Sequence, residues 1–353
     1  MQHLNTHGPA SEIARDGFTN IPSFFSTEEV EKVSHEVHRV LNQELALDKG
    51  PAQAAEGLRP YYTTASSNST GAVGSSFLGK SPILDEFATK LFADLRFIDL
   101  CNRLVGGNFR IYTFSMRQLT PQSRALGLHQ DNFGSLTISI PLNDIGKGLP
   151  TTYFVRGSHR FPINIADIVT PLPIRLFGSL LVPHVCRLGD LGIFLNKTFH
   201  GTFRGHSKST VVLINMVSEG FTYNPWSLPA ETSYGMNFRE AIGETLFMKL
   251  GATTGVVQRG GNSFIDTGSY SDGNENPKLL QMALGGRQML VLPFAQKSQG
   301  EDTCLTWKIS RGADYSARSV FLSGYLFCLK VVAYAKHALY KLKRGSKEVT
   351  PFV

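Results

Sequence analysis

Short apolar runs with a period of two recur through the middle of this chain. Residues 136–140 alternate aliphatic and hydroxyl side chains before Pro141 stops the pattern. Similar short runs occur at residues 109–119, 153–155, 191–195 and 211–217. Alternation with a period of two is typical of strands with one buried face. Several such strands separated by turns predict a sandwich or jelly roll, so we expect a mainly β protein with flanking helices and a core over about residues 108–218.

Helical spacing precedes this β region. Ser26-x-x-Glu29 is a capping box, and it opens a segment in which apolar residues recur at helical spacing from Val30 to Leu41. Residues 82–105 also look helical, and Gly106-Gly107 ends that segment. The pattern therefore predicts two helical segments ahead of the strands.

Composition suggests the remaining boundaries. Residues 1–15 predict a flexible N-terminus, and residues 16–22 predict a short strand ending at a proline. Residues 50–80 are rich in Gly, Ser, Thr and Ala, which predicts a long loop and a candidate lid. Residues 219–318 form an unassigned extension that we expect to pack on the core, with a helix at 240–250 and a strand at 289–292.

The last segment, 319–353, predicts a basic C-terminal helix. Its apolar residues between 320 and 344 are interleaved with Lys330, Lys336, Lys341, Lys343 and Arg344. Lysines interrupt this pattern too often for a helix that spans a membrane. Two interpretations stand: a helix docked on the core, or an interfacial helix that makes a peripheral contact with anionic lipid.

Overall composition changes this picture little. The chain has 353 residues, of which 42% are hydrophobic and 18% charged, as in ordinary globular proteins. A net charge of +7 favours anionic partners, but no nucleic-acid-binding motif is visible, so we expect no nucleic acid as a partner. Four scattered cysteines without a CxxC motif predict reduced thiols, and the N-terminus lacks a secretory pattern. These features predict a cytoplasmic protein.

The candidate chemistry lies at His129-x-Asp131 and at the distant His200. Side chains at i and i+2 of an extended segment lie on the same side, so His129 and Asp131 can point into one cavity. Two imidazoles and one carboxylate are the ligand set of non-haem Fe(II) oxygenases, which leaves positions open for a co-substrate and O₂. We expect the other histidines near this region, His159, His184 and His206, to be non-ligands.

The residues around this set resemble a known family. The run GLHQDN at 127–132 precedes a period-two strand, and the motifs Gly157-Ser158-His159-Arg160, Gly189-Asp190 and Phe199-His200-Gly201-Thr202 follow in that order. An N-terminal Asp16-Gly17-Phe18 adds to the pattern. This order is similar to that of the phytanoyl-CoA dioxygenase family of Fe(II)/2-oxoglutarate-dependent oxygenases, over roughly residues 12–217.

The resemblance implies a double-stranded β-helix, which is a cupin-like jelly roll, within an oxygenase domain over 16–218. It also implies Fe(II) as cofactor, with 2-oxoglutarate and O₂ as co-substrates. By motif position, His129, Asp131 and His200 are the implied iron ligands. The expected reaction hydroxylates an unactivated C–H bond of a small metabolite or a lipid- or sugar-linked substrate, and releases succinate and CO₂.

The implied 2-oxoglutarate site departs from the family pattern. Family members use a hydroxyl and an arginine after the last histidine to bind the distal carboxylate. Thr202 fits the hydroxyl position, but Val211 stands at the arginine spacing. Lys208 and Arg204 are the candidate replacement cations, and Arg117 is a candidate for the other end of 2-oxoglutarate.

Three functions compete on this evidence. The leading one is the Fe(II)/2-oxoglutarate hydroxylase, and the carboxylate of Asp131 supports it because related halogenases place a small residue there. The second is a cupin-type metalloenzyme that does not use 2-oxoglutarate, which the missing arginine favours. The third is a non-catalytic binding protein that docks on membranes through its C-terminal helix.

Overall fold

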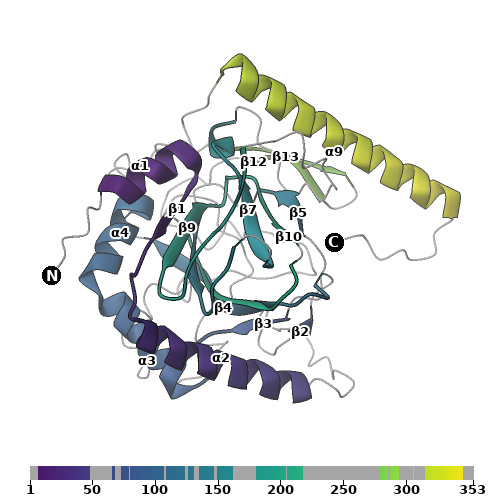
Figure 1. The fold of residues 1–353 in the computed structure, drawn as a ribbon. Helices are drawn as coiled ribbons and strands as arrows, with labels where there is room; N and C mark the ends of the chain where they lie inside the picture. Colours follow the sequence, from purple (N-terminus) through teal and green to yellow (C-terminus); the bar gives the residue numbers. More distant parts are fainter. Residues whose placement is uncertain are drawn as a thin grey trace, which may run out of the picture.

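Two antiparallel sheets face each other at the centre of the molecule (Figure 1). The structure is a computed structural model. It describes residues 7–47, 66–67, 73–78, 80–106, 109–123, 126–130, 135–146, 149–161, 180–203, 205–217, 279–284, 287–293, 305 and 315–344. The inner face of each sheet is defined as the face that lies toward the other sheet.

The larger sheet has seven strands. Their order is β1 (Phe18–Ile21), β9 (Leu191–Leu195), β6 (Ser135–Pro141), β11 (Ser209–Val217), β4 (Arg110–Leu119), β3 (Val73–Ser76) and β2 (Ser66–Ser67). The smaller sheet has the order β5 (Leu126–His129), β10 (His200–Phe203), β7 (Thr151–Val155) and β8 (Leu181–Pro183). Between β4 and β11 the chain crosses repeatedly from one sheet to the other, so each sheet interleaves early and late strands. This is the topology of a jelly roll, and the predicted double-stranded β-helix is confirmed.

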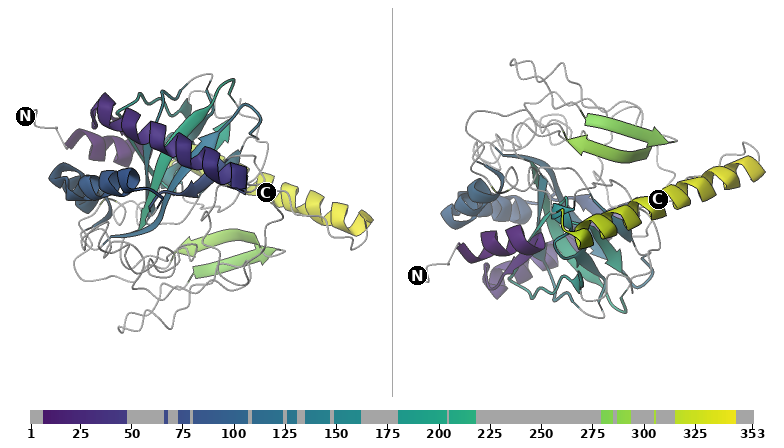
Figure 2. Two further views of the ribbon diagram at one scale, coloured as in Figure 1. Left: turned by 90° about the horizontal axis from the view of Figure 1, so that it is seen from below. Right: turned by 90° about the horizontal axis from the view of Figure 1, so that it is seen from above.

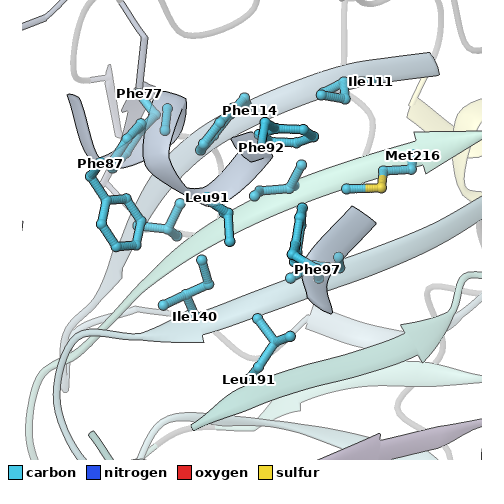
Figure 3. Close-up of a cluster of buried hydrophobic side chains, with 14 of the residues drawn as sticks. Phe77, Phe87, Leu91, Phe92, Phe97, Ile111, Phe114, Ile140, Leu191 and Met216 are labelled. Carbon is cyan, nitrogen blue, oxygen red and sulfur yellow. The ribbon is translucent and has the colours of Figure 1, made fainter. Parts of the chain in front are cut away.

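Helices cover the outer face of the larger sheet. They are α2 (Thr27–Leu47), α3 (Pro82–Ala93) and α4 (Leu95–Val105), and Figure 2 shows α2 lying across the strands. Figure 3 shows the core between them, where Phe77 stacks on Phe114 with ring centroids 4.8 Å apart. The aliphatic positions of β6 enter this core, and Ile138 and Ile140 are fully buried. The period-two pattern therefore sends one face of β6 to the helices and its hydroxyl face inward.

The inner faces meet through aromatic side chains. Phe154 of the smaller sheet stacks on Phe18 of the larger sheet, with ring centroids 4.5 Å apart. Its ring also lies 5.0 Å from that of Phe194 on β9. These three rings join the two sheets next to β10, the strand that begins at His200.

The sequence pattern missed two regular elements in the N-terminal region. Residues 7–16 form a helix, α1 (His7–Asp16), in place of a flexible terminus. Ile13 is fully buried, and the Ala14 carbonyl accepts a hydrogen bond from the His159 side chain at 3.0 Å. Contacts with distant residues thus stabilise a segment too short to form a stable helix by itself.

The second correction concerns the candidate lid at 50–80. Within it, β3 pairs with β4, and β2 pairs with β3, so residues 66–67 and 73–76 belong to the larger sheet. Residues 50–65 lie outside the described part of the chain. The helical region 82–105 is confirmed, but it divides at Asp94, whose side chain accepts a hydrogen bond from the Arg96 N–H at 2.8 Å and so caps α4.

The C-terminal part is described in pieces. A hairpin of β12 (Leu279–Leu284) and β13 (Arg287–Pro293) includes the strand predicted at 289–292. The helix predicted at 240–250 lies outside the described residues, and the packing of 219–318 as one extension stays a prediction. The basic helix is present as α9 (Ala317–Arg344). In the described parts of the chain, no helix combines the length and the apolar character that crossing a bilayer requires.

Candidate functional site

Two of the three predicted metal ligands meet across neighbouring strands. His129 ends β5, and its Cα is paired in register with that of His200, the first residue of β10. The two imidazole rings have centroids 4.3 Å apart and are tilted by 49°. Residues directly opposite in an antiparallel pair present their side chains on the same face. The structure therefore brings these two histidines together on one face of the smaller sheet.

The hydrogen bonds of His200 set which nitrogen can bind a metal. The Nδ1 atom lies 2.8 Å from the carbonyl oxygen of Thr198, which only accepts hydrogen bonds, so Nδ1 carries the proton. In the neutral ring, Nε2 then carries the lone pair that can bind a metal ion. A metal-binding histidine that donates its other N–H to a carbonyl is the usual arrangement.

The chain around His200 is held by long-range contacts. The Phe199 N–H donates to the Ser158 hydroxyl at 2.8 Å, and the Thr198 hydroxyl donates to the Gly17 carbonyl at 3.0 Å. His200 itself is only 6% exposed and lies against the ring of Phe194. Sequence reasoning missed these supporting roles of Ser158 and Thr198, because each depends on a partner that is distant in the chain.

The segment that leads to the third predicted ligand is anchored in the same way. Gln130 is buried, and its side-chain amide donates to the Lys197 carbonyl at 2.5 Å. Asp131 and Arg204 lie outside the described residues. Among the residues that are described, no group of three His, Cys, Asp or Glu side chains could hold a metal ion. The described part of the predicted set is therefore the pair of His129 and His200.

Thr202 occupies the position expected from the family pattern. It is 6% exposed and follows His200 by two residues in the same strand, so both side chains lie on the inner face. Its cross-strand neighbour on β7 is Thr152. A buried hydroxyl therefore lies two residues along the strand from His200.

Lys208, one candidate cation for the co-substrate, lies toward the helices. Its neighbour Thr210 bonds to His38 of α2, with the hydroxyl 3.1 Å from Nε2. Burial lowers the pKa of His38, and the nearby charge of Lys208 lowers it further. Lys208 is exposed, and its effect on His38 places it near α2 on the outer side of the larger sheet.

Arg117 lies on the other face of the sheet. The neighbours of Arg117 on β4, Met116 and Gln118, face the helices, since Met116 is in the core and Gln118 bonds to Thr210 at 3.3 Å. Arg117 alternates with them and so points inward, and its Nε atom is buried. Its Cα partner on β11 is Val211, the residue at the family's arginine spacing. The strand register thus places Arg117 beside position 211, where the sequence has valine in place of the expected arginine.

Two further histidines, His159 and His184, are buried and packed against neighbouring residues of the fold. His184 is packed against Gly192, where a Cβ atom would lie 2.2 Å from its ring, and its Nε2 is 3.1 Å from the Cys186 thiol. Burial lowers the pKa of His184 to about 4, and burial likewise lowers that of His159 to about 4. Burial also raises the pKa of the Cys186 thiol, so this pair is a neutral thiol and a neutral imidazole.

These two histidines predict a loss of stability in mild acid. Their folded pKa of about 4 lies below the ordinary value of 6.5, so the unfolded chain binds the protons more readily. The free energy of unfolding should therefore fall as the pH drops from about 6.5 toward 4, by an amount on the order of a few kcal/mol. Urea unfolding at pH 7 and pH 5 measures this difference.

His159→Gln should show a smaller difference between the two pH values, because one buried titrating ring is gone. His206→Gln is the matched control, since His206 is exposed, and it should keep the wild-type difference. Equal pH dependence in all three proteins would contradict the assignment to buried histidines.

Solved structures with a similar fold are known, although no family model and no curated protein matches the sequence. They include AviO1 from Streptomyces viridochromogenes Tue57, with 15% identity, a TM-score of 0.45, and coverage of 63% of this chain and 99% of that one. HygX from Streptomyces hygroscopicus, solved with nickel and 2-oxoglutarate bound, has 17% identity, a TM-score of 0.44, and coverage of 61% and 87%. The epimerase SnoN from nogalamycin biosynthesis, described as non-heme and alpha ketoglutarate dependent, has 18% identity, a TM-score of 0.44, and coverage of 63% and 86%. These similarities assign no chemistry to this chain, whose site is built from its own residues.

Proposed function

We propose that this protein is an Fe(II)/2-oxoglutarate-dependent dioxygenase. The observation that carries the proposal is the pairing of His129 with His200 across β5 and β10. The contact of His200 Nδ1 with the Thr198 carbonyl supports it, because it leaves Nε2 as the nitrogen that would bind a metal. A jelly roll brings these strands together, and the HxD motif supplies Asp131 as the third ligand. Membership of the phytanoyl-CoA dioxygenase family itself stays a prediction.

The donor set suits ferrous iron. Two imidazoles and a carboxylate bind one face of Fe(II) and leave positions for a co-substrate and O₂. When bound, the iron with 2-oxoglutarate and O₂ supplies the oxidising power to hydroxylate an unactivated C–H bond, with release of succinate and CO₂. His129, Asp131 and His200 would hold it.

The protein supplies orientation and shielding at this position. The bond from His200 to the Thr198 carbonyl holds the imidazole in one tautomer. The rings of Phe154 and Phe194 lie 6.4 and 5.1 Å from that imidazole and exclude water from its flank. A buried, oriented ligand of this kind suits an oxidation from which bulk water must be kept away.

The sequence suggested Arg117 for the other end of 2-oxoglutarate, but its register opposite Val211 leads us to propose instead that Arg117, with Thr202, binds the distal carboxylate. Arg117 lies directly across from Val211, and both side chains are on the inner face of the larger sheet. The Arg117 guanidinium can therefore bind a carboxylate in the space that an arginine at position 211 would reach. A guanidinium can bind a carboxylate through two parallel hydrogen bonds. Thr202 adds a buried hydroxyl on the strand of His200. This assignment favours 2-oxoglutarate over the cupin alternative that lacks it.

The substrate is proposed to be a small metabolite or a lipid- or sugar-linked compound, and the proposed outcome is hydroxylation. The reason for hydroxylation is the carboxylate of Asp131 in the HxD motif, which as a ligand would fill the coordination position that halogenation leaves to chloride.

The first test is 2-oxoglutarate turnover by the full chain without substrate. We expect Fe(II)-dependent release of succinate from the wild-type protein, and none when Fe(II) is replaced by Zn²⁺, which is redox-inert. Bound iron without succinate would instead support a cupin-type metalloenzyme. Failure to bind any divalent metal would support a non-catalytic binding protein.

A further inference from the structure

Helix α9 is attached to the molecule by its N-terminal half. Leu322, Tyr325 and Phe327 pack on an apolar cluster on the outer face of the smaller sheet, formed by Leu128, Val155, Phe161 and Phe199. The second half of the helix continues beyond the sheets, as the right-hand view of Figure 2 shows. The helix is therefore docked at one end and projects at the other.

An apolar stripe runs along the side of α9 that faces away from the core. Phe321, Cys328, Val332, Ala335 and Leu339 recur at spacings of three, four and seven residues, which places them on one line of a helix. Phe321 is 70% exposed, Val332 50% and Leu339 58%. The buried Ser323 lies about half a turn away around the axis. The stripe is about 27 Å long at 1.5 Å per residue.

The charges of α9 are all of one sign. Its sequence contains no Asp or Glu, and its charged residues are Arg318, Lys330, Lys336, Lys341, Lys343 and Arg344. A second copy of this chain is a poor partner for the stripe, because two such helices would repel each other. An anionic surface matches the charge, and a lipid bilayer also accepts the apolar stripe.

We propose that α9 lies on the surface of an anionic membrane. In this arrangement Phe321, Val332 and Leu339 enter the boundary between head groups and acyl chains, while the basic positions nearest the stripe around the axis, 318, 336 and 343, contact lipid phosphates. The helix lies in the plane of the surface and does not cross the bilayer. This proposal goes beyond the proposed function and does not depend on it.

Vesicle co-sedimentation of the full chain tests the proposal. We expect binding to vesicles of phosphatidylcholine mixed with phosphatidylglycerol, and little binding to phosphatidylcholine alone. Raising the salt to about 1 M, where the Debye length is about 3 Å, should weaken binding to the mixed vesicles. Equal sedimentation with both kinds of vesicle would overturn the role given to charge.

A matched pair of double variants distinguishes the effect of losing the apolar stripe from the effect of changing the net charge. Val332→Asp with Leu339→Asp should weaken binding by about tenfold or more, because it adds two charges to the membrane-facing line. Val185→Asp with Leu95→Asp makes the same chemical change at exposed positions outside α9, where Val185 is 57% and Leu95 81% exposed. An equal loss in both variants would contradict insertion of the stripe.

Cys328 gives an independent signal from within the stripe. It is exposed, whereas Cys101 and Cys186 are buried. In a Cys304→Ser background, an environment-sensitive dye on Cys328 should shift its emission to the blue when mixed vesicles are added. No shift, or a concentration-dependent dimer that Val332→Asp with Leu339→Asp dissociates, would overturn the proposal; the dimer would instead identify a second copy as the occupant.

Discussion

His200→Ala is expected to abolish iron binding and, with it, the release of succinate from 2-oxoglutarate. The variant removes one of two imidazoles whose ring centroids are 4.3 Å apart, and no other histidine is paired with His129 among the described strands. Losing a residue that merely orients a metal ligand costs about 10–100-fold in affinity, so the loss of a ligand itself should exceed about 100-fold. Iron content after desalting, and the absorption of Co(II) as a substitute metal, measure binding directly.

His206→Ala is the matched control for this variant. His206 lies six residues beyond His200 and is exposed, so its removal should leave metal content and succinate release unchanged. Circular dichroism must show that His200→Ala keeps the wild-type fold, since the side chain is buried, and His200→Gln provides a less disruptive second variant. Full metal binding by both folded His200 variants would remove the proposed metal centre.

Arg117→Ala is expected to raise the dissociation constant of 2-oxoglutarate by about 30-fold or more. Removing one partner of a buried charge pair costs about 2–5 kcal/mol, and Arg117 is the inward-pointing cation beside Val211. Arg117→Lys should recover part of the affinity, because lysine keeps the charge but lacks the guanidinium fork. Isothermal titration of the metal-loaded protein measures the affinity without turnover.

Lys208→Ala is the control that distinguishes the two cations. Lys208 is exposed and lies toward α2, so we expect its removal to change the dissociation constant little. A large rise for Lys208→Ala with none for Arg117→Ala would show that our assignment of the carboxylate is wrong. Unchanged affinity in both variants would leave Arg204, which lies outside the described residues, as the cation to test.

Local patterns in the sequence were enough to predict much of the framework. The period-two run at 136–140 forms β6, because alternation separates a face for the helices from an inner face. The capping box at Ser26 opens α2, where the Glu29 N–H donates to the Ser26 hydroxyl at 3.2 Å. His129 and His200 could be named as partners because the HxD motif and the order of surrounding motifs resemble a known family. Each of these signals lies within a few neighbouring residues.

Other features depend on contacts that no local pattern contains. Residues 7–16 are only 10 residues long, too short to be stably helical alone, and burial of Ile13 and the bond from His159 order them as α1. The Gly- and Ser-rich region that suggested a lid supplies β3, since β4 offers an open edge for pairing. The stripe on α9 is the side that stays exposed when Leu322, Tyr325 and Phe327 pack on the smaller sheet, and only that contact shows which side of the helix faces the core.

What the sequence determined by itself is therefore the chemical inventory: a β-rich core, two histidines with a carboxylate, a hydroxyl at 202 and a basic helix at the end. What the tertiary structure decided is which of these residues share a face. A strand alternates its side chains, so one step of register decides whether a residue faces the helices or the other sheet. That register sets Arg117 opposite Val211 and His129 opposite His200, and it arises from packing between strands that are far apart in the chain.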